Sequence, residues 1–308
     1  PVVLEQILNS IMGTADTMVV SNVGSAALSA VSLVDSINVL LIQAFSALAA
    51  GGAIVCAQYI GQRNYEKANM SARQVLFIIT AISVVVSAVC LIFQKPLLRL
   101  IFGAVDADVM RASEIYFFFT ALSFPFIAAY DSAASIFRAQ ENTKGPMTIS
   151  MISNIMNIGG NAVLIWVFHL GVAGAAISTL VSRIFCAVVV LWQLRKDRQP
   201  VVVKDYLKIR PDWSMIGRIL GLGIPSGIEN SMFQLGKLAI QSTVSTLGTA
   251  AIAAQAMTNI LENLNGIAAI GVGVGLMTIV GQCLGAGRKD EAVYYIKKLC
   301  VIAECVII

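Results

Sequence analysis

The chain has 308 residues, of which 57% are hydrophobic and only 12% charged. A soluble domain carries about 25% charged residues, so this composition excludes an ordinary soluble enzyme or binding module. The formal net charge of +4 does not indicate nucleic-acid binding, because the basic residues gather in loops between apolar runs. Runs near the ~20 residues that cross a bilayer recur along the chain. They are too long for barrel strands, and lipid-exposed backbone must be satisfied internally, so we predict an all-α membrane protein, a polytopic helical bundle.

We predict membrane-spanning helices at 1–23, 34–60, 72–95, 113–138, 145–168, 172–194, 216–246 and 253–282, with a ninth begun at 292. Pro1 opens inside an apolar run without a signal-peptide pattern, and Ile308 ends inside another. We therefore expect that the start of the protein and further helices are missing.

The orientation follows from the distribution of Lys and Arg. Four loops carry most of these residues, whereas the loops around Gly24, His169 and Gly248 carry none; the basic loops are 61–74, 138–144, 195–218 and 283–298. Only the predicted loop 95–112 departs from this pattern, because it carries basic residues although it lies on the opposite side of the membrane. Basic loops remain on the cytoplasmic side, so we predict a multi-pass protein of the cell membrane with a cytoplasmic amino terminus.

The chain repeats itself at a shift of 225 − 1 = 224 positions. Without a gap, this shift matches five proline, glutamine and glycine pairs, namely Pro1 with Pro225, Gly24 with Gly248, Gly51 with Gly275, Gln58 with Gln282 and Gly61 with Gly285. Such residues mark backbone or polar requirements and match by chance less readily than alanines. A direct repeat predicts two like-oriented lobes.

We divide the chain into a first six-helix lobe at 1–198, a cytoplasmic linker at 199–214 and the first helices of a second lobe at 215–308. The linker lies in the longest polar break, 195–218, which contains Pro200 and Pro211. Its Lys and Arg either form a solvated loop or bind anionic headgroups.

Six cysteines lie in apolar segments without paired metal spacing: Cys56, Cys90, Cys186, Cys283, Cys300 and Cys305. Cysteine commonly behaves as a small buried hydrophobe. We therefore expect neither a disulfide nor a metal site.

The first span contains two acids. Asp16 lies among Thr14, Ala15 and Thr17, and Ile240 occupies its repeat position. A charge within a membrane costs about 2.5–3.5 kcal/mol, so Asp16 indicates either a cation or proton site or a structural hydrogen bond. Glu5 is eleven residues earlier on nearly the same face, and it either extends that path or snorkels to the surface.

Further ionisable residues fall in the second, fourth and sixth spans. Asp35 either faces a central cavity or caps a helix near the outer surface. Asp131 follows Pro125, a residue that favours a kink, and it is a candidate for the cavity wall. Arg183 is a candidate counter-ion for Asp131.

The fifth span places Asn154, Asn157 and Asn161 within an arc of about 60°. Their amides suit a hard cation such as Na⁺ or a hydrogen-bond relay to a carboxyl group. The alternative is that they hold neighbouring helices together.

The seventh span carries a polar stripe of Asn230, Gln234, Lys237 and Gln241. The eighth span carries a second stripe of Gln255, Asn259 and Glu262. Folding the two helices about the Gly248 turn brings Lys237 and Glu262 to a similar depth. We predict that they form an ion pair, within either a polar seam or a cavity wall for polar or cationic substrates.

Several segments resemble the multidrug and toxic compound extrusion (MATE) family. GTADTMVVSNVG followed by AQYIGQRNYEKA is similar to the first two helices of that family, NIGGNAVLIWVFHLGVAGAAISTLVSR to its fifth and sixth, and GIPSGIENSMFQLG to the start of its seventh. Members have twelve helices in two lobes. The resemblance implies the first lobe and the opening of the second, with three to four helices absent.

The resemblance also implies a cation-coupling site in the first lobe at Asp16, Asn157, Asn161 and Thr179. Many members have aspartate at the position of Asn161, so a lone carboxyl with amide partners favours H⁺ over Na⁺. Glu229 resembles an acid found on the seventh helix of some members.

We therefore predict a secondary transporter that exports organic, cationic compounds by antiport with H⁺ or Na⁺, through a cavity with candidate residues Glu5, Asp35, Asp131, Glu229, Gln234, Lys237 and Glu262. The alternative is a lipid-linked oligosaccharide flippase, which requires several basic residues in its cavity. The chain lacks the motifs that an intramembrane enzyme requires. We expect no catalytic residues, no metal site and no cofactor apart from the coupling ion. The expected partners are a small-molecule substrate and the bilayer, without nucleic acid, and we expect a monomer.

Overall fold

The computed structural model describes residues 5, 7, 24–102, 106–196, 200–203, 211–245 and 249–307, and all regular elements within these ranges are helices. They are α2 (Ser25–Gly61), α3 (Tyr65–Ile92), α4 (Gln94–Phe102), α5 (Ala107–Leu122), α6 (Phe124–Ala139), α7 (Lys144–Ala162), the π-helix η1 (Val163–Val167), α8 (Gly171–Leu194), α9 (Trp213–Ser245), α10 (Thr249–Gly285) and α11 (Lys289–Ile307). The predicted all-α membrane bundle is confirmed.

Within the described ranges, four helices are long and apolar enough to cross a membrane: Ala26–Gly61, Tyr65–Ile92, Lys144–Val167 and Gly171–Leu194. A fifth span is formed if α5 and α6 are taken together, although they are bent by 42°. The predicted span at 113–138, with its expected kink at Pro125, is therefore present as two helices, and its start at Ala107 instead of residue 113 is a first correction. Pro125 lies in the first turn of α6 and has no backbone N–H, so the hydrogen-bond ladder breaks at Ser123.

The predicted loop 95–112 contains a helix, α4, which is a second correction. Leu98 is buried while the neighbouring Lys95 and Arg99 are exposed. A short helix of this kind satisfies its backbone internally while its basic side chains remain in the polar layer.

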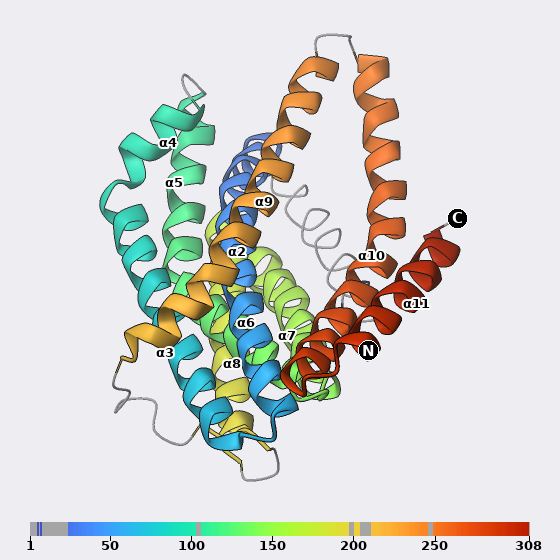
Figure 1. Ribbon diagram of the computed structural model, residues 1–308. Helices are drawn as coiled ribbons and strands as arrows, with labels where there is room; N and C mark the ends of the chain where they lie inside the picture. Colours follow the sequence, from blue (N-terminus) through green and yellow to red (C-terminus); the bar gives the residue numbers. More distant parts are fainter. Residues whose placement is uncertain are drawn as a thin grey trace.

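The core of α2 to α8 is built around α6, which packs against α2, α3 and α8 (Figure 1). Small buried residues such as Ala128, Ala133 and Ala134 line α6 and let the neighbouring backbones approach closely. Phe45 of α2 meets Phe124 of α6 edge to face, with ring centroids 6.2 Å apart. The result is a tightly packed unit in which α6 is central.

The last two helices, α10 and α11, repeat the register of α2 and α3. The starts of α10 and α2 differ by 249 − 25 = 224 residues, their ends by 285 − 61 = 224, and the starts of α11 and α3 by 289 − 65 = 224. This is the shift found in the sequence. Both α9 and α10 pack against α2, and α11 packs against α10.

The helices α2 and α10 converge at one end of the molecule, the lower end in Figure 1, and separate toward the other. At the convergence each helix presents a glycine to the other's backbone. A Cβ on Gly61 would collide with the carbonyl of Gln282, and one on Gly285 with the carbonyl of Gln58. Because Gln58 and Gln282 are repeat partners, the crossing is reciprocal. Only glycine permits this approach.

Side chains also join the helices at this end. Thr278 and Gln282 of α10 donate to the carbonyls of Arg138 (3.3 Å) and Ala139 (3.0 Å) in the last turn of α6. These carbonyls lie at the C-terminus of α6, and that of Arg138 also accepts from the Glu141 N–H (2.9 Å). The turns that follow Gly61, Ala139 and Gly285 therefore lie together, and we call this end of the bundle the basic end.

Part of the predicted linker packs against the first lobe. Val201 and Val203 are fully buried. The backbone N–H of Val201 donates to Gln140 Oε1 (3.0 Å), and that of Val202 donates to Asn69 Oδ1 (2.8 Å). Pro200 is exposed, but the valines that follow pack inward, because they gain more from burial than from hydration. The Lys and Arg of the linker, to which the expectation of a solvated loop applied, lie outside the described residues.

The cysteines are all free, but only some are buried. Cys56, Cys90 and Cys186 are buried as expected, Cys283 is half-buried, and Cys300 and Cys305 on α11 are exposed. Among the described elements α11 packs against α10 alone, so most of its surface is uncovered.

Candidate functional site

A cavity of about 550 Å³ lies between α2 and α9. It contains two predicted cavity residues, Asp35 from α2 and Gln234 from α9; the other lining residues are Leu28, Val31, Ser32, Ser36, Val39 and Leu40. Asp35 is the only charged residue among them. The cavity is thus largely apolar with one acidic group, which suits an organic molecule carrying a positive charge.

Asp35 lies well inside α2, so the alternative that it caps a helix is wrong. Its Oδ1 accepts hydrogen bonds from Asn38 Nδ2 (3.2 Å) and from the Tyr116 hydroxyl (3.3 Å). Both donors hold the carboxylate in position. Among the described residues, Asn38 Oδ1 is buried without a hydrogen-bond partner.

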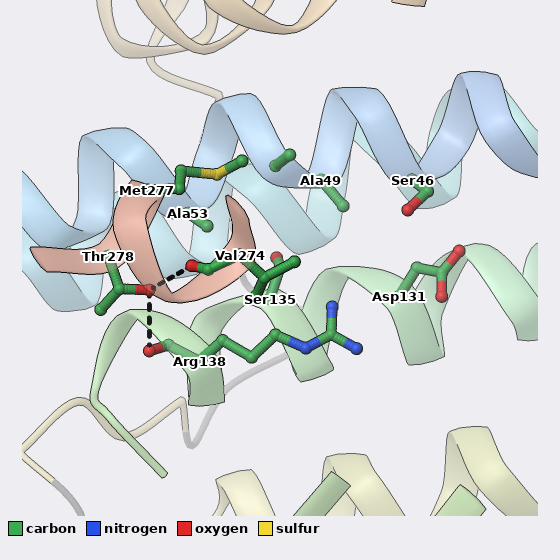
Figure 2. A pocket seen from close by; sticks show the side chains of 10 residues that line it. Ser46, Ala49, Ala53, Asp131, Ser135, Arg138, Val274, Met277 and Thr278 are labelled. Carbon is green, nitrogen blue, oxygen red and sulfur yellow. Dashed lines mark hydrogen bonds between the residues drawn. The ribbon is translucent and has the colours of Figure 1, made fainter. Parts of the chain in front are cut away.

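A second cavity, of about 80 Å³, lies between α2, α6 and α10 near the basic end, and Figure 2 shows it from close by. It holds the predicted residue Asp131 together with Arg138; its other lining residues are Ser46, Ala49, Ala50, Ala53, Ser135, Val274, Met277 and Thr278. In Figure 2 the Arg138 side chain runs along the cavity from the Thr278 side toward Asp131. One wall belongs to α10, which therefore closes the cavity.

Glu5 is buried at the side of this second cavity. Its Oε1 accepts from Arg138 Nη2 and from the Tyr130 hydroxyl, each at 3.4 Å, and the exposed fractions of the Arg138 and Glu5 side chains are 20% and 4%. The alternative that Glu5 snorkels to the surface is therefore wrong. The carboxylate forms a buried ion pair with α6.

Arg183 of α8 lies between the two cavities. Its Nη1 donates to Ser123 Oγ at 2.7 Å, at the break between α5 and α6, and its charge acts on both Asp35 and Asp131. As a counter-ion it is therefore shared, and its direct hydrogen bond goes to a hydroxyl. The break at Ser123 thus provides the polar group that accepts this arginine.

The asparagine cluster of α7 forms a connected network with α8. Asn161 Nδ2 donates to Asn157 Oδ1 (3.3 Å), and Asn157 Nδ2 donates to Thr179 Oγ1 (3.3 Å). Both asparagines are buried, and the π-helix η1 begins at Val163, directly after them. Three of the four predicted coupling residues therefore lie together. The fourth, Asp16, lies outside the described residues.

The predicted ion pair between α9 and α10 is confirmed, with Lys237 Nζ 2.8 Å from Glu262 Oε1. Their side chains are 39% and 49% exposed, so the pair lies on an open face. Glu229, two turns earlier on α9, is exposed and outside both cavities.

Arg138 is the functional residue that the sequence interpretation missed, because it was assigned to a basic loop. It belongs to the last turn of α6 and turns into the cavity. The signal was present in the spacing, since Arg138 follows Asp131 by seven residues. Seven residues are nearly two helical turns, so the two lie on one face.

Comparison with known proteins identifies the family. The MatE family model matches residues 1–163 and 225–308, two segments whose starts differ by 225 − 1 = 224 residues. The probable multidrug resistance protein YoeA of Bacillus subtilis is 27% identical over 300 residues, which cover 94% of this chain and 64% of that protein. The probable multidrug resistance protein NorM of Thermotoga maritima is 25% identical over 305 residues, which cover 97% of this chain and 64% of that protein.

Solved structures agree with the fold. A transporter of the MOP superfamily from Pyrococcus furiosus superimposes with a TM-score of 0.92 at 19% identity, covering 99% of this chain and 68% of that one. The chain spans about 64% of the length of the curated relatives named above. Since the family model covers most of the chain, the protein belongs to the MatE family of multidrug and toxic compound extrusion transporters.

Proposed function

We propose that this protein is a secondary active efflux transporter that exports organic cations in exchange for H⁺ or Na⁺. The observation that carries the proposal is the cavity between α2 and α9, which is apolar apart from a few polar groups and one carboxylate, Asp35. An apolar wall favours the body of a hydrophobic molecule, and an oriented carboxylate favours its positive charge.

The alternating movement that export requires is supported by the way in which the helices meet. The helices α2 and α10 are joined at the basic end by the reciprocal glycine crossing, whereas they separate toward the other end (Figure 1). A rocking motion that opens the basic end and closes the other would expose a central cavity to each side in turn. The basic loops support a cytoplasmic location for that end and for the amino terminus, in the cell membrane.

The coupling ion is proposed to bind at the asparagine network with Asp16. Amide oxygens and a threonine hydroxyl lie together at Asn157, Asn161 and Thr179, which are linked by hydrogen bonds. Since Asn161 is uncharged, the site has fewer negative charges than a Na⁺ cage commonly supplies, which favours H⁺. We propose that the protein acts as a monomer on a small-molecule substrate within the bilayer.

The flippase alternative is less well supported. A phosphate headgroup requires several arginines or lysines in the cavity, and the lining residues that the structure describes for the larger cavity include none. Lys237 is already paired with Glu262, and Arg138 with Glu5.

Binding of a fluorescent organic cation to the purified whole protein tests the role of the larger cavity. Asp35→Asn should weaken binding about tenfold or more, because a charge-assisted hydrogen bond contributes about 1.5–3 kcal/mol. Ser36→Ala, which changes a neighbouring lining residue, is the matched control and should bind as the wild type does. Unchanged affinity in Asp35→Asn would remove the basis for assigning organic cations to this cavity.

A further inference from the structure

Among the residues that the structure describes, the charged groups around the two cavities do not balance; Asp16 lies outside these residues and is not counted. Arg183 and Arg138 supply two positive charges, whereas Asp35, Asp131 and Glu5 supply three negative ones. Arg138 is paired directly with Glu5, and Arg183 donates to Ser123 while its charge is shared by Asp35 and Asp131. One carboxylate is therefore in excess. A single proton would make the five groups neutral, which is favoured in a low-dielectric interior.

Asp131 is the carboxylate whose surroundings favour that proton. Within the described part of the chain its Oδ2 is buried and accepts no hydrogen bond, and no ion pair with it is formed. Asp35, in contrast, accepts two hydrogen bonds, and Glu5 accepts two. Burying an ionised carboxylate oxygen without a hydrogen-bond donor costs free energy, whereas burying the same oxygen in its protonated form costs much less.

The groups that face Asp131 come from several helices. Arg138 and Tyr130 lie on its own helix, Arg183 and Cys186 on α8, and Glu5 on the preceding segment. The cavity lining from α2 and α10 consists of alanines, Ser46, Val274, Met277 and Thr278, none of which titrates.

The α10 wall makes the hydration of Asp131 depend on the conformation. The cavity that Asp131 lines is closed by Val274, Met277 and Thr278, and Thr278 holds α10 to the carbonyl of Arg138 (Figure 2). If α10 moves away from α6, the cavity opens toward the basic end and water reaches the carboxylate. An ionisable group that is dry in one state and hydrated in the other must couple proton binding to the equilibrium between them.

We propose that Asp131 binds a proton on Oδ2 while α10 seals the cavity and releases it to water when the basic end opens. This inference rests on the proposed alternation between the two forms, and it assigns Asp131 a proton site separate from the Asp16 cluster. The O–H bond forms when a hydronium ion gives its proton to Oδ2 as the basic end closes, while water still reaches the carboxylate, and it breaks when the proton passes to water in the open form. Lower pH therefore favours the form that is closed at the basic end.

The experiment follows the closure of the basic end with spin labels on Glu66→Cys and Asp290→Cys, which are exposed repeat partners at the starts of α3 and α11. The whole protein is labelled after Cys283, Cys300 and Cys305 are replaced by serine. The ratio of closed to open molecules should rise as pH falls, by at most about tenfold per pH unit for one proton. Asp131→Asn, which is isosteric and permanently neutral, should be mostly closed, and its ratio should change at least threefold less per pH unit.

Asp131→Glu should restore the pH response, and Ser135→Ala, which changes the same cavity without removing a carboxylate, should respond as the wild type does. A full pH response in Asp131→Asn, or none in the wild type, would overturn the inference. The proposed function is tested separately in the same samples, because a cationic substrate should change the distance distribution at constant pH. A substrate response without the effect of Asp131→Asn would refute only the proton site, whereas the absence of any substrate response would count against the transport proposal.

Discussion

The reciprocal crossing of α2 and α10 yields the sharpest prediction on conformation. Gly285→Ala adds one methyl group where Gln58 presents a backbone carbonyl, and a backbone atom cannot turn aside as a long side chain can. The helices must therefore separate. Overpacking of this kind costs about 1–3 kcal/mol, and that cost applies only to the form in which the basic end is closed.

A cost of about 1–3 kcal/mol lowers the ratio of closed to open molecules about 5- to 150-fold. Gly275→Ala is the matched control, because it makes the same substitution in the same helix with no atom within 4 Å of the new methyl group. Alanine is the better helix former by about 1 kcal/mol, so the control should be as stable as the wild type or more so.

The assay is the distance between spin labels at positions 66 and 290, measured at constant pH. Gly285→Ala should move the distribution toward longer distances, Gly61→Ala should do the same because the crossing is reciprocal, and Gly275→Ala should leave it unchanged. If Gly285→Ala and Gly275→Ala gave the same distribution, the crossing would not determine closure and the reasoning would fail.

Two further predictions concern charge. Glu5→Gln removes the charged partner of Arg138 and should lower the free energy of unfolding by about 2–3 kcal/mol. This is less than the ~3–5 kcal/mol for a fully buried pair, because the Arg138 side chain is 20% exposed. An unchanged midpoint of thermal unfolding in detergent would argue against a stabilising pair. Asn161→Asp adds a carboxylate to the Asn157 and Thr179 network and should increase the dependence of transport on Na⁺. Equal transport with and without Na⁺ in that variant would contradict the assigned coupling site.

Features that depend on periodicity were predictable from the sequence. The bounds of α8 and α10 and the end of α2 follow from apolar runs and from the loops between them, although α2 begins 34 − 25 = 9 residues before its predicted start. The repeat register in α10 and α11 follows from the 224-residue shift. The Lys237 and Glu262 pair was also predictable, because two antiparallel helices joined by a short turn place residues equally far from the turn at the same depth.

Features that depend on tertiary contacts were not predictable. A kink near Ser123 was predictable from Pro125, but the polar role of Ser123 appears only where Arg183 of α8 reaches it. Val201 and Val203 are buried because acceptors on Asn69 and Gln140 hold the linker down, although both lie far away in the sequence. Arg138 carries the sign expected of a cytoplasmic loop; its spacing from Asp131 indicates the inward face, but its pairing with Glu5 appears only in the structure.

The central claim, export of organic cations by antiport, is tested most directly by efflux of a cationic dye from proteoliposomes that contain the whole protein. Efflux is followed under an imposed pH gradient and then under an imposed Na⁺ gradient, with and without Asp16→Asn. The account predicts efflux that the pH gradient drives and that Asp16→Asn abolishes. Efflux that ignores both gradients, or that persists unchanged in Asp16→Asn, would contradict it and favour the flippase alternative.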